Sequence, residues 1–307
     1  MSVSLWCDEE GKDSQKAQLR AQWDPSVSGE RVINRLLLLE ERYLLSPLYI
    51  SLIQGEPHRR EQLTKWVLEV CCECGCEESV YPLSVALLDR FLSASLSLSI
   101  SPLCLSAACI LLASKVTGSE QVGVDNLCAV ANFCFLPENL RDMERVVLAT
   151  LQWDVAVVTP HDFLPHLLSS VERERVGENG QTDRDDEAFL STLRRHVDTL
   201  VAMCVCDSRF LGIPPSLIAA AALNAALSGL GSKVPQLGPN ELATLCQIDL
   251  VMLQYYTELI EGALVERLRN GLREGKTCPE VEKKHEELEE IVTERASTPT
   301  DLREIDF

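Results

Sequence analysis

The densest group of reactive side chains in this 307-residue sequence is a run of four cysteines, Cys71, Cys72, Cys74 and Cys76. Thiolates bind zinc when four ligands surround the ion as a tetrahedron, and the ligands usually come from two separated pairs. No second pair stands at a matching distance, and the four cysteines occupy the predicted end of a helix and the turn after it. We therefore interpret them as unpaired thiols and expect no metal site.

The sequence contains no motif of a common enzyme class. The phosphate loop G-x-x-x-x-G-K-[ST], the zinc helix H-E-x-x-H and the nucleophile turn G-x-S-x-G are absent. The five histidines are scattered, and none is paired in sequence with a nucleophile. We expect a protein that is not an enzyme, has no catalytic residues and needs no cofactor.

The composition restricts the partners. The formal net charge is −19 and the sequence pI is about 4.7. An acidic surface disfavours nucleic acid and anionic membranes, because both bind basic patches. Of the 13 cysteines, Cys104, Cys109, Cys128, Cys204 and Cys246 lie in apolar helical runs, where a thiol acts as a small buried hydrophobe. With no apolar N-terminal signal segment, this pattern predicts a reducing, intracellular compartment.

The most apolar stretch runs from Ser101 to Lys115. Ser101 and Pro102 suit an N-cap and a first helical position, and apolar side chains then occupy every face. Such a helix is either buried or membrane-spanning, and this one is shorter than the roughly 20 residues that a bilayer needs. We predict the central helix of a bundle. Lys115 at its end suits the helix dipole, so a solvated helix end is one explanation of this residue.

Amphipathic helices are predicted around this central helix, because apolar residues recur at helical spacing on both sides of it. Pro47 and the polar segment Gln54–His58 are predicted to end the first of them. The predicted helices of this first unit are Ser28–Tyr43, Glu61–Cys74, Tyr81–Leu96, about Asp125–Phe133 and Leu136–Leu151, and Trp153 is predicted to close the unit.

A second unit repeats this order of helices. Thr159 and Pro160 suit a helix start, and the central helices of the two units lie about 110 residues apart, a spacing typical of a duplicated domain and too long for a solenoid. No stretch alternates like a strand, so we predict an all-α chain. After a charged loop at Val171–Glu187, the predicted helices are Glu187–Asp207, Pro214–Gly229, Asn240–Ile248 and Asp249–Leu268. We divide the chain into a flexible N-terminus (1–27), two helical units (28–155 and 156–268) and a flexible acidic tail (269–307).

Five segments, which follow one another along the chain as they do in cyclins, resemble the cyclin family, and D-type cyclins in particular. The tail T-P-T-D-L-R-E-I-D at Thr298–Asp306 is also similar to that of D-type cyclins. The resemblance covers nearly the whole chain and implies two tandem five-helix cyclin folds after an N-terminal helix. The segments are E-E-R-Y-L at Glu40–Leu44, W-V-L-E-V-C at Trp66–Cys71, L-L-D-R-F-L at Leu87–Leu92, L-A-S-K at Leu112–Lys115 and T-P-H-D-F at Thr159–Phe163.

The resemblance implies a non-catalytic subunit that binds and activates a cyclin-dependent kinase. In the family, a lysine that ends the central helix and a glutamate on the last helix of the first fold contact the kinase near its mobile C helix. These positions match Lys115 and Glu144. Judged from the residues alone, a solvated helix end for Lys115 and a helix-face charge for Glu144 are the favoured explanations, and the resemblance reverses this preference. The segment Val116–Gly118 replaces the more charged one typical of D-type members, a departure that bears on kinase affinity.

Leu5, Cys7 and Glu9 form the pattern L-x-C-x-E, by which D-type cyclins resemble other binders of retinoblastoma-type pocket proteins. An extended peptide can place alternate side chains into pockets while its carboxylate meets helix N-terminal amides. The resemblance therefore implies a pocket-protein partner, and with it a role in cell-cycle entry.

Many cyclins dock substrates and kinase-inhibitor proteins that carry an R-x-L peptide on a hydrophobic patch of the first helix. The matching positions include Arg60, Leu63 and Trp66. Leu63 and Trp66 keep the apolar floor, but Arg59 and Gln62 replace residues that are usually apolar, so we predict weak or altered docking.

Thr298 precedes Pro299 and resembles the family's phosphorylation site for nuclear export and ubiquitin-dependent destruction. A phosphate there adds nearly two negative charges, which a protein with a basic binding site can recognise. The resemblance implies a ubiquitin ligase as a partner and both nucleus and cytoplasm as locations. A simple Thr-Pro turn is the alternative.

Two other functions remain open. The first is a helical transcription-factor scaffold, since basal transcription factors share the cyclin fold, although those bind DNA through basic surfaces and this chain is acidic. The second is a cyclin-like protein that binds a kinase without activating it.

Overall fold

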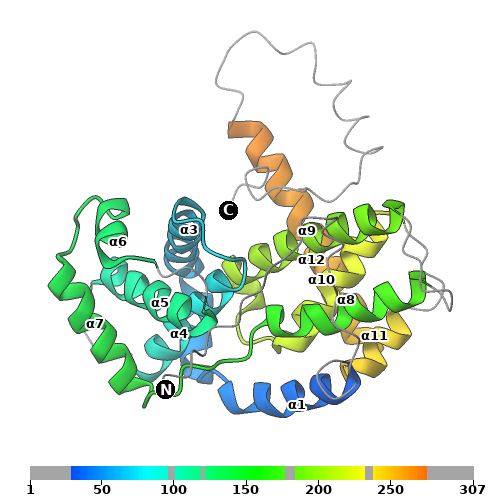
Figure 1. Cartoon of the computed structure of the whole chain (residues 1–307), viewed down its shortest axis with the longest axis horizontal. Helices are drawn as coiled ribbons and strands as arrows, with labels where there is room; N and C mark the ends of the chain where they lie inside the picture. Colours follow the sequence, from blue (N-terminus) through cyan, green and yellow to red (C-terminus); the bar gives the residue numbers. More distant parts are fainter. Residues whose placement is uncertain (1–28, 96–100, 119–121, 177–183, 232–237, 275–307) are drawn as a thin grey trace, which may run out of the picture.

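The computed structural model describes residues 29–95, 101–118, 122–176, 184–231 and 238–274 (Figure 1). Within these ranges the chain forms helices and connecting turns and no strand, which confirms the prediction of an all-α chain. No helix in the described part combines the length and the apolar character that crossing a bilayer requires. The predictions for residues 1–27 and for the tail beyond Glu274 lie outside these ranges.

The first five-helix fold surrounds α5 (Pro102–Thr117). Every residue of α5 from Cys104 to Ser114 is buried, so the prediction of a central helix is confirmed. Gly118 ends α5 in the left-handed conformation at φ 69°, which a glycine adopts without steric cost. The helices packed on α5 are α3 (Pro57–Glu73), α4 (Val80–Ala94) and α7 (Pro137–Thr150), and α6 (Val124–Val130) completes the fold by packing against α3 and α7.

The second fold repeats this plan around α10 (Pro215–Gly229). From Ser216 to Leu227 only Asn224 is not fully buried, and its amide donates a hydrogen bond to Thr257 Oγ1 at 3.1 Å. The helices around α10 are α8 (Pro160–Val176), α9 (Arg184–Cys206), α11 (Pro239–Leu245) and α12 (Leu250–Glu274), with the short helix η2 (Ser208–Phe210) after α9.

Two helices and a 3-10 turn precede the first fold, where the sequence predicted one helix. They are α1 (Glu30–Glu40), η1 (Glu41–Tyr43) and α2 (Pro47–Gly55). α1 packs on the second fold, because Ile33 is fully buried in that core. Glu40 accepts hydrogen bonds from the backbone N–H and the hydroxyl of Ser216, at 2.9 and 2.7 Å, and so caps the start of α10 from a distant part of the chain.

Several helix boundaries differ from the sequence-based prediction. α3 begins at Pro57, inside the polar segment Gln54–His58 that we predicted as a stop and before the predicted start at Glu61. Pro47 begins α2, although we predicted a stop there, because proline suits the first helical position as well as a helix break. α8 continues to Val176, past the predicted loop start at Val171, because Val171 is itself fully buried in the second core. α12 likewise continues to Glu274, beyond the predicted end at Leu268.

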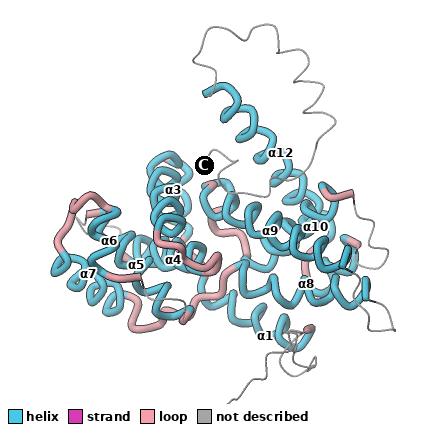
Figure 2. The backbone as a smooth tube through the Cα atoms, turned by 45° about the horizontal axis from the view of Figure 1, so that its top comes forward, coloured by secondary structure: helices cyan, strands magenta, loops and turns pink. Residues whose placement is uncertain are grey.

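The two folds meet where α3 and α4 contact α9 (Figure 2). The Thr64 hydroxyl lies 3.4 Å from the carbonyl oxygen of Cys206, and the Ser208 N–H donates to Glu61 Oε1 at 3.1 Å. Direct hydrogen bonds from α3 to the end of α9 and to η2 therefore fix the first fold against the second.

Candidate functional site

Lys115 and Glu144 form an ion pair between the end of α5 and the middle of α7. The Lys115 side chain is 42% exposed and that of Glu144 is 16% exposed. The pair therefore lies at the surface with its ammonium group accessible to a partner. The structure brings together the two residues that the sequence had only placed 29 positions apart.

The buried faces of α5 and α7 hold this pair in place. Lys115 directly follows a buried run that ends at Ser114, whose hydroxyl donates to the carbonyl of Leu111 at 3.0 Å. On α7, Leu140 and Val147 flank Glu144 and are fully buried. Both charged residues thus stand on helices that are locked into the core, so little rotation of either helix is possible.

Large apolar side chains are exposed on the same segments. Val116 follows Lys115, Leu136 precedes α7, Val146 lies on α7 and Trp153 follows its end, with exposures of 44, 62, 41 and 74% respectively. The sequence predicted that Trp153 would close the first unit. Trp153 follows the end of α7, and its side chain points to solvent from a residue with a φ of 61°.

Asp154 anchors the turn that carries Trp153. The Tyr43 hydroxyl donates to Asp154 Oδ1 at 2.9 Å, and the Arg90 guanidinium donates to the Asp154 carbonyl at 2.6 Å. Arg90 also stacks on the Tyr43 ring, 4.8 Å from its centroid. Burial and the nearby carboxylate raise the pKa of Tyr43. Parts of E-E-R-Y-L and L-L-D-R-F-L thus serve to position the end of α7.

This surface consists of a cation, a carboxylate and exposed apolar groups on a rigid frame. It presents no nucleophile-base pair and suits recognition of another protein. The family model of the cyclin N-terminal domain matches residues 31–156, and that of the cyclin C-terminal domain matches residues 158–286.

This chain belongs to the cyclin family.

Its relatives include D-type cyclins, which confirms the resemblance seen in the sequence. G1/S-specific cyclin-D2 of Gallus gallus is 35% identical over 302 residues, covering 94% of this chain and 96% of the relative. G1/S-specific cyclin-D3 of Homo sapiens is 37% identical over 259 residues, covering 82 and 84%. A viral cyclin from herpesvirus saimiri is similar in structure, with a TM-score of 0.62 at 24% identity over 77% of this chain and 97% of the viral one. The two tandem cyclin folds are thereby confirmed.

The three residues matched to the docking patch of this cyclin do not share one surface. Leu63 and Trp66 are half-buried and pack against the first core. Arg60 is buried, and its guanidinium forms two hydrogen bonds with Asp89, at 3.0 and 2.8 Å. Although burial opposes the charge, Asp89 raises the pKa of Arg60. Arg60 is therefore not available to a docking peptide. Arg59 is exposed and pairs with Glu56 at 2.7 Å.

The L-x-C-x-E residues Leu5, Cys7 and Glu9, and the predicted phosphorylation site Thr298, lie outside the described residues. Within the described ranges, no group of three or more His, Cys, Asp or Glu side chains is placed to hold a metal ion.

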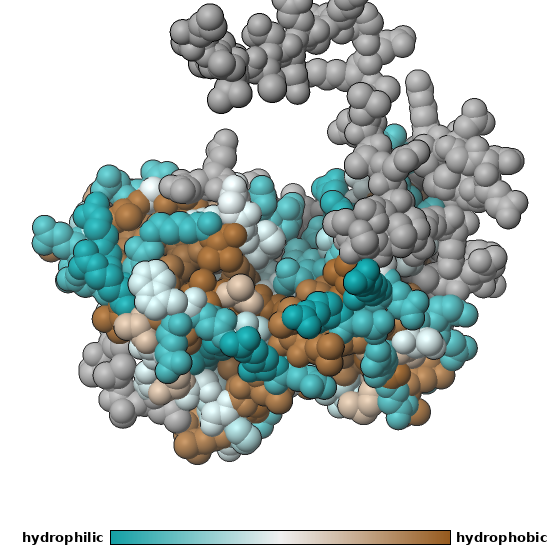
Figure 3. All heavy atoms as spheres, turned by 60° about the horizontal axis from the view of Figure 1, so that its bottom comes forward, coloured by the Kyte–Doolittle hydropathy of each residue, from teal (hydrophilic) through white to brown (hydrophobic). Residues whose placement is uncertain are grey.

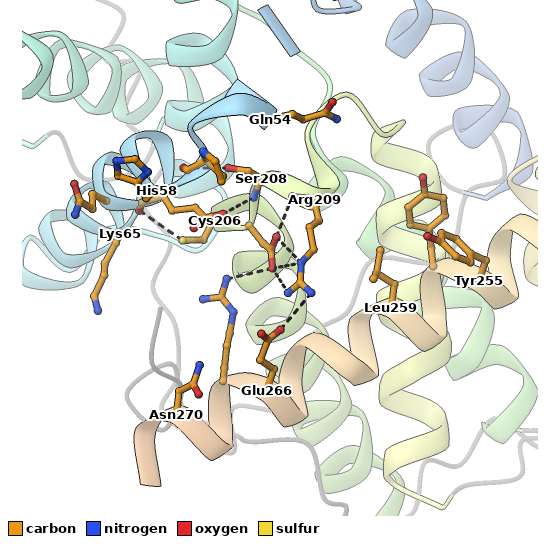
Figure 4. Close-up of a pocket in the computed structure, with 16 residues that line it drawn as sticks. Gln54, His58, Lys65, Cys206, Ser208, Arg209, Tyr255, Leu259, Glu266 and Asn270 are labelled. Atoms are coloured by element: carbon orange, nitrogen blue, oxygen red, sulfur yellow. Dashed lines mark hydrogen bonds and ion pairs between the residues drawn. The ribbon is translucent and has the colours of Figure 1, made fainter. Parts of the chain in front are cut away.

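A cavity of about 980 Å³ lies between α3, η2 and α12 (Figure 4). Arg209 and Glu266 approach each other across it, 3.3 Å apart. Arg209 also donates to Asp207, whose pKa it lowers even though burial acts in the opposite direction. These side chains bond one another, which is typical of a structural ion-pair network. Figure 3 shows one face of the molecule, on which apolar and polar side chains are interspersed.

Proposed function

We propose that this cyclin binds a cyclin-dependent kinase through the surface around Lys115 and Glu144 and thereby activates it. The observation that carries this proposal is the accessible Lys115–Glu144 pair on two core-locked helices. The names of the D-type relatives, which describe them as G1/S-specific cyclins, support it.

The proposed mechanism is a shift in the kinase's conformational equilibrium. An active kinase needs an ion pair between a strand lysine and a glutamate of its C helix, so this helix must lie inward. A rigid surface that binds only the inward position stabilises the active state by its difference in affinity for the two states. α5 and α7 supply that rigidity, because their inner faces are buried in the core.

The polar groups suit such a contact. An ammonium group has three donors, and the ion pair with Glu144 directs the Lys115 side chain along the surface. The remaining donors can bind backbone carbonyls at the end of a partner helix, where cations are favoured. The exposed apolar groups Val116 and Trp153 supply area that a partner can cover.

We further propose that Leu5, Cys7 and Glu9 direct the kinase to a retinoblastoma-type pocket protein and so promote cell-cycle entry. The support is the L-x-C-x-E pattern and the G1/S-specific relatives. In the same scheme, kinase-inhibitor proteins bind the complex. Phosphorylated Thr298 recruits a ubiquitin ligase, and the protein works in nucleus and cytoplasm.

The departure at Val116–Gly118 keeps one alternative open, a cyclin that binds a kinase without activating it. The two functions differ in the activity of the complex and not in its formation.

The proposal is tested by mixing the purified full chain with a panel of cyclin-dependent kinases and measuring co-elution. Lys115→Glu should reduce the affinity of the kinase that binds. The matched control is Arg269→Glu, a charge reversal on an exposed residue of α12 in the second fold, which should leave affinity unchanged. Equal binding by wild type and Lys115→Glu would refute the proposed contact.

A further inference from the structure

The end of α3 places two cysteines in contact. The Cys76 N–H donates to the Cys71 carbonyl at 2.9 Å, and the Gly75 N–H donates to the Cys72 carbonyl at 3.2 Å. Gly75 lies in the left-handed region at φ 64°. This pattern is a Schellman turn, in which the second residue past the helix end faces a residue of the last turn and usually makes an apolar contact with it.

Here both positions are cysteines, and the thiols of Cys71 and Cys76 are hydrogen-bonded to each other. Cys71 is buried, at 4% exposure, whereas Cys76 is half-buried and open to solvent on one side. The spacing C-x-x-x-G-C therefore brings two thiols together across a helix-ending turn. A search for separated pairs of zinc ligands does not detect this arrangement.

The two thiols differ in acidity. The hydrogen bond from Cys71 lowers the pKa of Cys76, while the same bond and burial raise the pKa of Cys71. The neighbouring Cys74 has its pKa raised, chiefly by burial. The thiolate is the reactive form of a cysteine, so Cys76 is the nucleophile of the group, with a second thiol in contact to react with any oxidised product.

The surroundings admit a small oxidant. Cys71, Cys72 and Cys76 line a cavity of about 280 Å³ between the end of α3 and helices α8 and α9 of the second fold. Its other walls include His161, Arg195 and Asp198. Arg195 favours the thiolate over the thiol, whereas the carboxylates of Asp198, Glu77 and Glu78, which also line the cavity, oppose it.

We propose that Cys71 and Cys76 are a redox modification site that forms a reversible disulfide with hydrogen peroxide as the oxidant. The Cys76 thiolate attacks one peroxide oxygen, so that an S–O bond forms, the O–O bond breaks and hydroxide leaves; the sulfur is oxidised and the peroxide reduced. The Cys71 sulfur then attacks the Cys76 sulfur. The S–S bond forms, the S–O bond breaks, and the departing hydroxide leaves as water with the Cys71 proton. A dithiol reductant restores both thiols.

The test treats the full chain with peroxide, blocks free thiols and maps the disulfides by mass spectrometry. The wild type should show a Cys71–Cys76 disulfide that dithiothreitol removes. In Cys71→Ser the disulfide should be lost and a sulfenic acid should persist at Cys76, detected with dimedone. In Cys76→Ser both should be lost. Cys72→Ser, which removes an adjacent and more exposed thiol, should behave like the wild type.

Several results would overturn the proposal. One is a wild type whose exposed Cys134 is oxidised while Cys71 and Cys76 stay reduced. Another is a disulfide that joins Cys72 or Cys74 in place of the proposed pair, or a sulfenic acid that forms at Cys71. Circular dichroism establishes that each variant is folded, and the wild-type map decides the question even if Cys71→Ser does not fold.

Discussion

Arg60 and Asp89 form a buried ion pair inside the first fold, and the same guanidinium reaches the second fold. Arg60 donates hydrogen bonds to the backbone carbonyls of Val205 and Cys206, at 3.1 and 3.2 Å. The Tyr49 hydroxyl adds a further bond to Asp89 at 2.7 Å. One arginine thus joins α3, α4 and the end of α9, and it fixes the relative position of the two cyclin folds.

Loss of this arginine should destabilise the protein strongly. Arg60→Met leaves Asp89 buried without its cation, which costs about 3–5 kcal/mol when one partner of a buried pair is removed. Arg60→Lys should recover little of this, because lysine cannot form the paired bonds to the carboxylate. The measurement is thermal or urea unfolding followed by circular dichroism. Arg59→Met is the control, since Arg59 is exposed; an equal loss in both variants would contradict the assigned role.

Trp153 should matter for kinase binding and not for stability. Its side chain is 74% exposed, while Asp154 beside it is held by Tyr43 and Arg90. Trp153→Ala should weaken kinase binding by about 2 kcal/mol, roughly 30-fold, as for an aromatic hot spot. Calorimetric titration measures the affinity, and Tyr255→Ala on α12 is the exposed aromatic control. A Trp153→Ala variant with wild-type affinity would remove this residue from the interface.

The reactivity of Cys76 should begin at lower pH than that of Cys74. The ordinary thiol pKa is 9.0; the bond from Cys71 lowers that of Cys76, and burial raises that of Cys74. Because alkylation needs the thiolate, its rate at Cys76 should rise through a midpoint below 9.0. Iodoacetamide labelling across the pH range measures both midpoints in one sample. Cys71→Ala should shift the Cys76 midpoint upward, and an unchanged midpoint would mean that Cys71 does not stabilise the thiolate.

Asp207 should contribute stability that is lost in acid. Although burial acts in the opposite direction, hydrogen bonds from Arg209 lower its pKa below the ordinary value of 3.8. The Asp207 carboxylate therefore binds a proton more readily in the unfolded chain than in the folded one. Its contribution to stability is complete above the pKa of the unfolded state and disappears as the pH falls through the pKa of the folded state.

Asp207→Asn should accordingly lower the unfolding midpoint at neutral pH, by the equivalent of about 1–3 kcal/mol. On acidification the variant should lose less of its stability than the wild type does. Unfolding curves between about pH 3 and pH 7 check this. Asp142→Asn, at an exposed pair with Arg145, should change stability by less than about 1 kcal/mol. Parallel pH curves for wild type and Asp207→Asn would contradict the assignment.

The repeated order of helices was predictable because it follows from local patterns. Proline and small-residue signals place both central helices, and the Thr159 start is confirmed by the Asp162 carboxylate, which accepts bonds from the Thr159 N–H and hydroxyl at 2.6 and 2.9 Å. α2 was missed because a proline marks a helix start as readily as a stop.

Contacts between distant segments could not be predicted in this way. Nothing local in α1 indicates that Ile33 enters the second core or that Glu40 caps α10. Arg60 sits in a polar run, so its burial depends on Asp89 and on the end of α9. The pairing of Lys115 with Glu144 was suggested by family resemblance, and only the packing of α5 against α7 brings them together.

The central claim is that the Lys115–Glu144 surface holds a kinase in its active state. The most direct measurement is the phosphorylation rate of a cyclin-dependent kinase on a pocket-protein peptide, at cyclin concentrations where fluorescence anisotropy shows the complex to be formed. The account predicts a rate far above that of the kinase alone, and a loss of that increase in Lys115→Glu but not in Arg269→Glu. A saturated complex whose kinase works no faster than the free enzyme would contradict it.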